Sequence, residues 1–146
     1  MTKSVSIVLS LILGVALGAT LPSARAQAPR GERTAWYFYR VKWGHQDEFL
    51  ELFKKNHYPV LKEQMGERLV GFKAYVPQFH GDGRADWTFA TELVFKSDEL
   101  FLAPSNEEAI ARRLYPDFAR FREEEARRFE ILDAHWDVPL REVPME

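Results

Sequence analysis

The stretch from Ala35 to Val76 decides the fold. It opens with the aromatic run AWYFYRVKW (35–43), turns at Gly44 and continues as an amphipathic segment over 46–65. A second strand-like run, LVGFKAYV (69–76), follows directly. Aromatic and β-branched residues favour strands, whereas apolar residues three or four positions apart favour a helix. The stretch therefore predicts a strand, a helix and a second strand.

The rest of the chain completes a small, two-layered plan. Beyond a turn-rich segment at 77–86, the sequence predicts a strand over 87–95, a helix over 106–129 and a strand over 131–138. Ser105 and Glu108 have the spacing of a capping box at the start of that helix. The order β-α-β-β-α-β predicts an α+β, ferredoxin-like fold. Its four-stranded antiparallel sheet is expected in the order four, one, three, two, with both helices on one face.

Each predicted helix contains a proline. Pro59 lacks an N–H and leaves the carbonyl of Lys55 without its donor, which predicts a kink near 56–58. Pro116 interrupts the second helix, whose Arg128 is expected to pair with Glu124 on the solvated side. The buried stripe of the second helix is expected to comprise Ile110, Leu114, Phe118 and Phe121.

The N-terminus has the pattern of a secretory signal. Lys3 precedes an apolar run over 5–19, and Ala24-Arg25-Ala26 forms a small-x-small cleavage site. We therefore expect residues 1–26 to be a signal peptide and 27–33 a disordered leader, with one domain over 34–146. An uncleaved membrane anchor is the alternative interpretation, but the apolar run is short for a membrane span.

Composition narrows the class of protein. Loss of Lys3 and Arg25 with the signal changes the formal net charge from −2 to −4, and no basic stripe remains, so nucleic acid is not expected as a partner. The chain has no cysteine, so packing, and a partner subunit, must supply its stability. We expect an exported protein, periplasmic or secreted, without a stable membrane anchor after cleavage.

Alternation along the strands divides the sheet into two faces. The helix-covered face is expected to be apolar and to include Tyr37, Tyr39, Thr91 and Trp136. The opposite face combines Trp36, Phe38 and Leu69 with four polar residues, which are Arg40, Lys73, Glu92 and His135. Such a large apolar patch is costly in water, and its charges alternate in sign between strands. We therefore expect this face to pack against a second copy in an isologous homodimer.

At this point the chain resembles the dimeric α/β-barrel superfamily. The residues that carry the resemblance are Trp43-Gly44, Asp47-Glu48-Phe49, His57-Tyr58-Pro59, Gly66, Leu69-Val70-Gly71-Phe72 and Phe95-Lys96-Ser97. It covers residues 34–138 and is nearest in appearance to NIPSNAP-type and EthD-like domains, and less to antibiotic-biosynthesis monooxygenases. The resemblance implies a dimeric α/β barrel. Members of this superfamily include cofactor-free oxygenases, isomerases, haem enzymes and proteins without known activity, so the fold does not select a reaction.

His57 is the first candidate catalytic residue. Its helical phase turns it toward the sheet, and EthD-like domains often have a histidine two residues before a proline here. It could act as a general base in a cleft where Tyr37, Tyr39, Thr91 and Trp136 bind substrate. The alternative is a buried neutral histidine that bonds the carbonyl freed by Pro59, or Tyr39. The aromatic residues could equally be ordinary core.

The other groups of polar residues can be explained by structural roles as well as by ligand binding. Arg40, Lys73, Glu92 and His135 could bind an anionic ligand in the barrel interior, or form a paired network in the dimer interface. No metal site is expected: His80, Asp82 and Asp86 lack a second histidine at ligand spacing, and Asp133, His135 and Asp137 are too far apart along a strand. No cofactor is expected, although a single axial ligand has no spacing signature and haem ligation by His57 or His135 stays open.

The function expected from the sequence is binding of a small, mostly apolar organic molecule between helices and sheet. If the protein is an enzyme, the resemblance implies a cofactor-free oxygenase or isomerase. The alternatives are a non-catalytic binding or assembly module and a haem-binding protein.

Overall fold

The computed structural model describes residues 31–78, 86–143 and 145. The expected signal peptide, residues 27–30 of the expected leader and the His80 and Asp82 of the turn-rich connection lie outside the described residues. The four strands are β1 (Arg33–Val41), β2 (Leu69–Tyr75), β3 (Phe89–Phe95) and β4 (Leu132–Pro139). The helices are α1 (Gln46–Leu52), the π-helix η1 (Phe53–His57), α2 (Tyr58–Glu63), α3 (Asp98–Leu102), α4 (Glu107–Leu114) and α5 (Phe118–Glu130).

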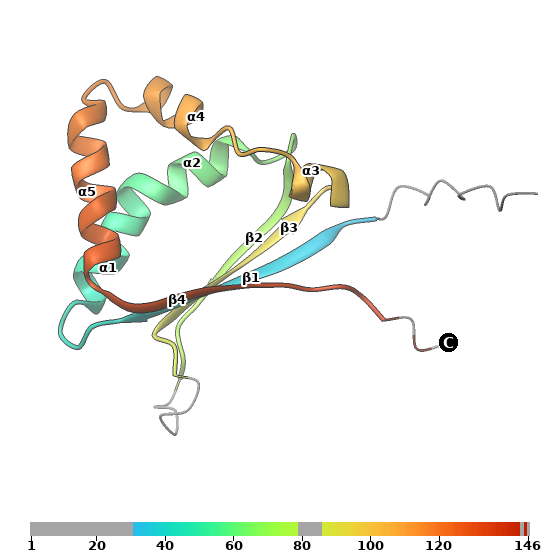
Figure 1. The fold of residues 1–146 in the computed structure, drawn as a ribbon, viewed down its shortest axis with the longest axis horizontal. Helices are drawn as coiled ribbons and strands as arrows, with labels where there is room; N and C mark the ends of the chain where they lie inside the picture. The colour runs from blue at the N-terminus through green and yellow to red at the C-terminus, as the bar shows by residue number, and fades with distance from the viewer. Residues whose placement is uncertain (1–30, 79–85, 144, 146) are drawn as a thin grey trace, which may run out of the picture.

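The sheet has the order β2-β3-β1-β4, and every neighbouring pair is antiparallel. This is the strand order that the sequence predicts. The helices of the described chain gather on one side of the sheet, with α5 standing at the end where α1 begins (Figure 1). The chain therefore has the two-layered α+β architecture expected of a ferredoxin-like fold.

The first long helix contains a π-helical turn just ahead of its proline. η1 occupies Phe53–His57, and the N–H of Tyr58 donates to the carbonyl of Phe53, five residues back. The carbonyl of Lys55, which Pro59 deprives of its α-helical donor, instead accepts a bond from the Tyr115 hydroxyl at 2.8 Å. The predicted irregularity at 56–58 is thus a π turn rather than a simple kink. After α2, Gly66 has a left-handed φ of +87°, which suits glycine at a helix end.

The second long helix is divided as the sequence predicts. α4 ends at Leu114 and α5 begins at Phe118, with Pro116 in the break between them. The Asp117 side chain accepts a bond from the N–H of Arg120 and caps α5. Between β3 and α4, Ser97 caps the short α3 in the same way. The expected stripe packs against α2 around Val60, Ile110 and Ala111.

A β-bulge in β4 reverses the face assignment made from its sequence. Leu132 lies opposite Val41 and Ala134 lies opposite Arg40, so Asp133 is an extra residue without a partner position. Beyond it, His135 lies opposite Tyr39, and Trp136 lies opposite Phe38. The sequence assigned Trp136 to the helix-covered face and His135 to the opposite face. Both assignments were wrong, because strict alternation does not allow for the extra residue.

A second bulge affects the start of β2. Leu69 pairs with Phe95 and Gly71 pairs with Val94, which leaves Val70 as the extra residue. Leu69 is therefore buried in the core under the helices, not on the open face as alternation predicts, and Val70 is exposed. From Gly71 onward the expected alternation holds, since Lys73 pairs with Glu92 on the face away from the helices. Arg33, placed in the leader by the sequence, is the first residue of β1.

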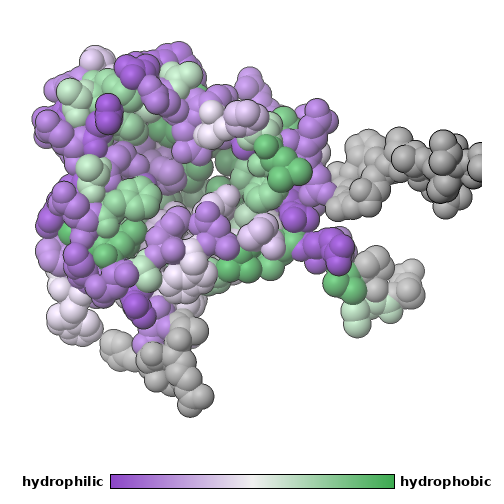
Figure 2. Space-filling view, in the orientation of Figure 1, coloured by the Kyte–Doolittle hydropathy of each residue, from purple (hydrophilic) through white to green (hydrophobic). Residues whose placement is uncertain are grey.

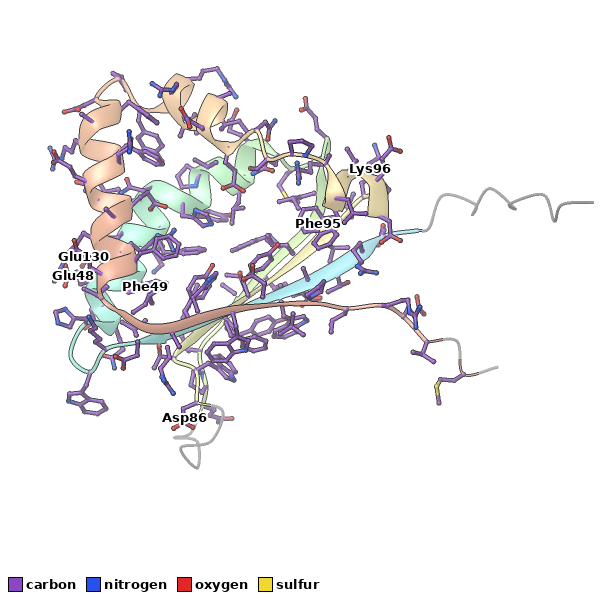
Figure 3. All side chains as sticks on the ribbon, viewed as in Figure 1. Glu48, Phe49, Asp86, Phe95, Lys96 and Glu130 are labelled. Atoms are coloured by element: carbon purple, nitrogen blue, oxygen red, sulfur yellow. The ribbon has the colours of Figure 1, made fainter. Side chains whose placement is uncertain are left out.

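The main core lies between α1, η1 and the sheet. Figure 3 labels Phe49 beside α1 and Phe95 beside α3, at opposite ends of this layer, and both are buried. Hydrophobic surface also runs along the lower margin of the molecule, on the side of the sheet away from the helices (Figure 2). Across the residues that the structure describes, no helix is both long and apolar enough to span a bilayer.

Candidate functional site

A cavity of about 190 Å³ lies between the helices and the sheet. β1, β3 and the start of β2 form its floor, and η1, α2 and the segment from α3 to α4 form its walls. Its lining residues are Tyr37, Tyr39, His57, Leu61, Gln64, Arg68, Leu69, Thr91, Leu93, Phe95, Phe101, Ser105 and Glu107. The structure thus brings four of the sequence-predicted site residues, Tyr37, Tyr39, His57 and Thr91, to one cavity.

His57 is the last residue of the π turn. Its ring packs against Phe53 with 5.1 Å between ring centroids. Its Nδ1 atom lies 3.6 Å from Oε2 of Glu125 on α5, within ion-pair range but longer than a hydrogen bond. Tyr115, not His57, bonds the carbonyl that Pro59 leaves free. The structural role that the sequence offered for His57 at this carbonyl is therefore filled by another residue.

Glu125 is fixed by a buried arginine. Nε and Nη2 of Arg128 donate to the two carboxylate oxygens of Glu125 at 3.0 and 2.7 Å. Arg128 is 1% exposed, and the Phe129 ring lies 4.6 Å from its guanidinium carbon. Burial acts to raise the pKa of Glu125, but the neighbouring His57 and Arg128 outweigh it, and the net pKa is lowered. Glu125 is therefore an anion at neutral pH. The expected Glu124–Arg128 pair does not form, because Arg128 turns into the core.

Two tyrosines supply hydroxyl groups to the cavity floor. Burial raises the pKa of Tyr39 to about 12. Burial also raises the pKa of Tyr37 to about 12, with smaller contributions in the same direction from Asp137 and Glu107. Both phenols consequently stay protonated at neutral pH and can donate hydrogen bonds. Thr91, opposite Tyr37 in the sheet register, is 1% exposed and adds a third hydroxyl.

Charged residues stand at the end of the cavity near α3. The guanidinium of Arg68 donates to the carbonyl oxygens of Pro104 and Ala103, each at 2.9 Å, and stacks on Phe95. Glu107, the first residue of α4, lines the same end. Ser105 is exposed and also lines the cavity, so this end opens toward the surface. Arg68 therefore holds the segment that forms the rim.

The bulge in β4 puts two of the predicted site residues, Trp136 and His135, on the opposite faces of the sheet from those predicted. Trp136 stacks on Phe38 on the open face, with 5.4 Å between ring centroids, and does not line the cavity. His135 lies on the helix side, with its ring centroid 4.4 Å from that of Tyr39. Burial lowers the pKa of His135, Arg128 and His57 act in the same direction, and Asp137 at 3.4 Å opposes them.

The open face of the sheet combines aromatic rings with three of the predicted charges. Trp36 stacks on Tyr75 at 5.0 Å and on Phe38 at 5.7 Å. The Tyr75 hydroxyl donates to Glu92 at 2.7 Å, and Lys73 lies 3.7 Å from the same carboxylate. Arg40 is exposed on the same face. We call Trp36, Phe38, Tyr75, Trp87 and Trp136 the open-face aromatic cluster.

Sequence reasoning missed Arg68, Glu107 and Glu125, and it gave no role to Gln64. One signal could have found Glu125 and its partner. The stripe that runs through Phe118 and Phe121 continues at helical spacing to Glu125 and Arg128, so both were on the buried side of α5. No comparable signal marks Arg68 or Glu107, because both reach the cavity only through the way the loops fold.

Comparisons with known structures identify the fold. A hypothetical protein from Arabidopsis thaliana is similar with a TM-score of 0.50 and 14% identity, over 81% of this chain and 94% of that chain. A dimeric ferredoxin-like protein from an uncultured marine organism has a TM-score of 0.50 and 6% identity, over 80% and 94%. A NIPSNAP family protein from Agrobacterium tumefaciens has a TM-score of 0.48 and 14% identity, over 80% and 90%.

The chain is an α+β protein of the ferredoxin-like class, and its structural neighbours include NIPSNAP family proteins and dimeric ferredoxin-like proteins. The expected ferredoxin-like fold is thereby confirmed. At these identities the similarity establishes the fold and not the activity. No protein-family model and no curated protein sequence matches the chain.

Proposed function

We propose that this protein is an exported homodimer that binds a small, mostly apolar organic molecule in the cavity between helices and sheet. The observation that carries the proposal is the meeting of His57, Tyr37, Tyr39 and Thr91 in one cavity. A cavity of about 150 Å³ is enough to hold benzene in a protein core, so about 190 Å³ suits one ring with a short substituent.

The surroundings of the cavity favour an uncharged ligand. Arg128 is neutralised by Glu125 and does not line the cavity. The charge of Arg68 is shared among main-chain carbonyls, and Glu107 lines the same end. The deeper polar groups, namely the tyrosine hydroxyls, Thr91 and Gln64, are neutral. A bound anion would gain no free cation in exchange for its hydration, whereas a neutral ligand with an acceptor oxygen could use the hydroxyl donors.

His57 gives this cavity a proton acceptor. A ligand carbonyl held by Tyr37 or Tyr39 has acidified neighbouring C–H bonds, and His57 could remove such a proton while the hydroxyls stabilise the enolate oxygen. Return of the proton to another carbon completes an isomerisation, and reaction of the carbanion with dioxygen would be a cofactor-free oxygenation. The proposed activity is therefore proton transfer on a neutral carbonyl or phenol, with His57 as the base.

Three probes of the same size and different charge test the proposal. Acetophenone, benzoate and benzylamine are compared by ligand-observed saturation-transfer NMR with the purified mature chain. We expect acetophenone to bind and the two ions to bind more weakly. Ser105→Trp should block the opening and abolish the signal, and Asn106→Trp, at an exposed neighbour outside the lining, should leave it.

The outcomes separate the alternatives. Binding of acetophenone that Ser105→Trp removes supports the cavity as the site, and loss of exchange of its methyl protons with deuterium in His57→Gln supports the catalytic role. Binding without exchange would favour a non-catalytic binding module. Binding of none of the probes would contradict the ligand site and leave the homodimer as the main function of the fold.

The homodimer has its own support. The open-face aromatic cluster is only half-buried within one chain, and the helices cover the other face of the sheet. An uncovered apolar patch of this kind marks an interaction surface. Packing two such faces against each other would bury the rings and bring Arg40 and Lys73 close to a second set of carboxylates. Export is proposed from the N-terminal sequence pattern alone.

A further inference from the structure

We propose that Glu125 is a positioning residue for His57. Held by Arg128, it would keep Nδ1 of His57 protonated and present the unprotonated Nε2 to the cavity. For its catalytic meaning this inference rests on the proposed function, but its structural content can be tested without any ligand. Neither Glu125 nor Arg128 lines the cavity, so both act through His57.

Two sets of contacts fix the position of Glu125: those between its carboxylate and Arg128, and those between Arg128 and the surrounding rings. Arg128 reaches both carboxylate oxygens, which is the strongest geometry for an arginine–carboxylate pair. The guanidinium is itself surrounded by the rings of Phe49, Phe53 and Phe129, at 5.8, 5.7 and 4.6 Å from its central carbon. Because Arg128 cannot move without opening the core, Oε2 of Glu125 stays on the Nδ1 side of His57.

The remaining neighbours do not compete for Nδ1. The Tyr115 hydroxyl is committed to the carbonyls of Lys55 and Asn56. The side chains of Lys55 and Asn56 donate to Glu124, the residue before Glu125 on α5. Tyr39 lines the same cavity as His57, Arg128 binds the Glu125 carboxylate that His57 approaches, and His57 helps to lower the pKa of His135. Glu125 is the one anion recorded within ion-pair distance of His57 among the described residues.

The burial of Arg128 indicates that the Arg128–Glu125 pair has a role beyond stabilising the fold. Its Nη1 atom is buried and has no hydrogen-bond partner among the described residues. A buried arginine that leaves one nitrogen unsatisfied is costly, so the position is hard to explain by stability alone. The geometry instead aligns the guanidinium with the Glu125 carboxylate and leaves that carboxylate directed at His57.

The test is the tautomer of His57. Nitrogen-15 NMR of the histidine rings distinguishes a protonated Nδ1 from a protonated Nε2. In the unaltered protein above the titration range of the ring, we expect His57 to show protonated Nδ1 and unprotonated Nε2. In Glu125→Gln the preference for protonated Nδ1 should be lost. Glu123→Gln, an exposed glutamate on the same helix, should leave the spectrum unchanged.

A second measurement guards against loss of folding. The pKa of Glu125, read from the carbon-13 shift of its carboxylate, should rise in His57→Gln because a group that lowers it is removed. Glu125→Asp keeps the carboxylate and should retain the tautomer preference at least in part. A His57 tautomer that is the same in Glu125→Gln as in the unaltered protein would overturn the inference.

The two proposals fail separately. If no probe binds but the tautomer depends on Glu125, the positioning role stands and the proposed ligand site falls. If acetophenone binds and exchanges its protons but the His57 tautomer is unchanged in Glu125→Gln, the ligand site is supported and the positioning role of Glu125 is contradicted.

Discussion

The hydroxyl of Tyr115 lies 2.8 Å from the carbonyl oxygen of Lys55 and 3.0 Å from that of Asn56. Tyr115 precedes Pro116, in the break between α4 and α5, and Lys55 lies within the π turn ahead of Pro59. Pro116 interrupts the second long helix, and Pro59 removes the donor that the Lys55 carbonyl would have in an α-helix. The Tyr115 hydroxyl, next to Pro116, replaces that donor. The break in the second helix therefore stabilises the turn that carries His57.

Replacing Tyr115 by Phe removes this donor and keeps the ring. We expect a loss of about 1 kcal/mol in the free energy of unfolding, the usual contribution of one intramolecular hydrogen bond. Urea denaturation followed by fluorescence measures it. Tyr58→Phe is the matched control, because the exposed Tyr58 packs by its ring against Phe72 and should change little.

A double-mutant cycle with Pro59→Ala shows whether the proline is the cause. An alanine at this position would have an N–H that can reach the Lys55 carbonyl, so the hydroxyl would become partly redundant. We expect Tyr115→Phe to cost less when it is combined with Pro59→Ala than when it is made alone. Strict additivity of the two changes would contradict this explanation of the tyrosine.

Charge placed in the open-face aromatic cluster should separate the dimer. In Trp136→Glu a carboxylate would lie beside Phe38 within the proposed interface, where desolvation is costly. Light scattering after size exclusion should give the dimer mass for the unaltered protein and the monomer mass for the variant. Trp43→Glu is the control: Trp43 is 85% exposed beyond the end of β1, and its substitution should leave the mass unchanged. A monomeric unaltered protein at high concentration would contradict the proposed homodimer.

Deleting one residue from β4 tests the bulge. Removal of Asp133 would let Leu132 and Ala134 follow each other opposite Val41 and Arg40, with every later side chain still on its present face. We expect this deletion to fold with a small change in melting temperature. Deleting Ala90 instead, from β3, whose pairing with β1 has no bulge, would invert the faces of the residues on one side of it and should lower the melting temperature sharply. Equal effects of the two deletions would contradict the assignment of Asp133 as an extra residue that the pairing of β1 and β4 does not need.

Acid stability should depend on Glu124. Bonds from Lys55 and Asn56 lower the pKa of Glu124 to about 2, below the ordinary value of 4.5. A group whose pKa falls on folding stabilises the native state above its unfolded pKa, and this contribution disappears as pH falls through the folded pKa. The stabilisation by Glu124 should thus be complete above about pH 5 and vanish between pH 4.5 and 2.

The matched variants are Glu124→Gln and Glu123→Gln. The melting temperature of Glu124→Gln should lie below that of the unaltered protein at neutral pH, and the two curves should converge as pH approaches 2. Glu123→Gln should run parallel to the unaltered protein over that range. A difference between Glu124→Gln and the unaltered protein that is independent of pH would contradict the role of its charge.

The fold could be predicted because hydrophobic periodicity fixes which elements form, and the order of elements fixes how they pair. The strand order and the helix layer followed from this alone. The faces of β4 could not be predicted, because nothing in the run from Leu132 to Val138 marks Asp133 as an extra residue. The cavity residues Tyr37 and Thr91, which lie where the pairing of β1 and β3 has no bulge, were placed correctly. Arg68 and Glu107 were not, because loop geometry brings them to the site.

The π turn also has a consequence for the whole helical layer. An α-helix advances about 100° per residue, so one additional residue in a turn rotates everything after it by that amount relative to what comes before. Leu61 follows Phe49 by 12 residues, and the extra residue of the π turn brings it to about 20° from the azimuth of Phe49 instead of about 120°, so both side chains point into the same core. His57 ends the π turn, where this rotation is complete. A chain without the extra residue would still form the helix, but Leu61 would turn about 100° away from the side on which Phe49 meets the core.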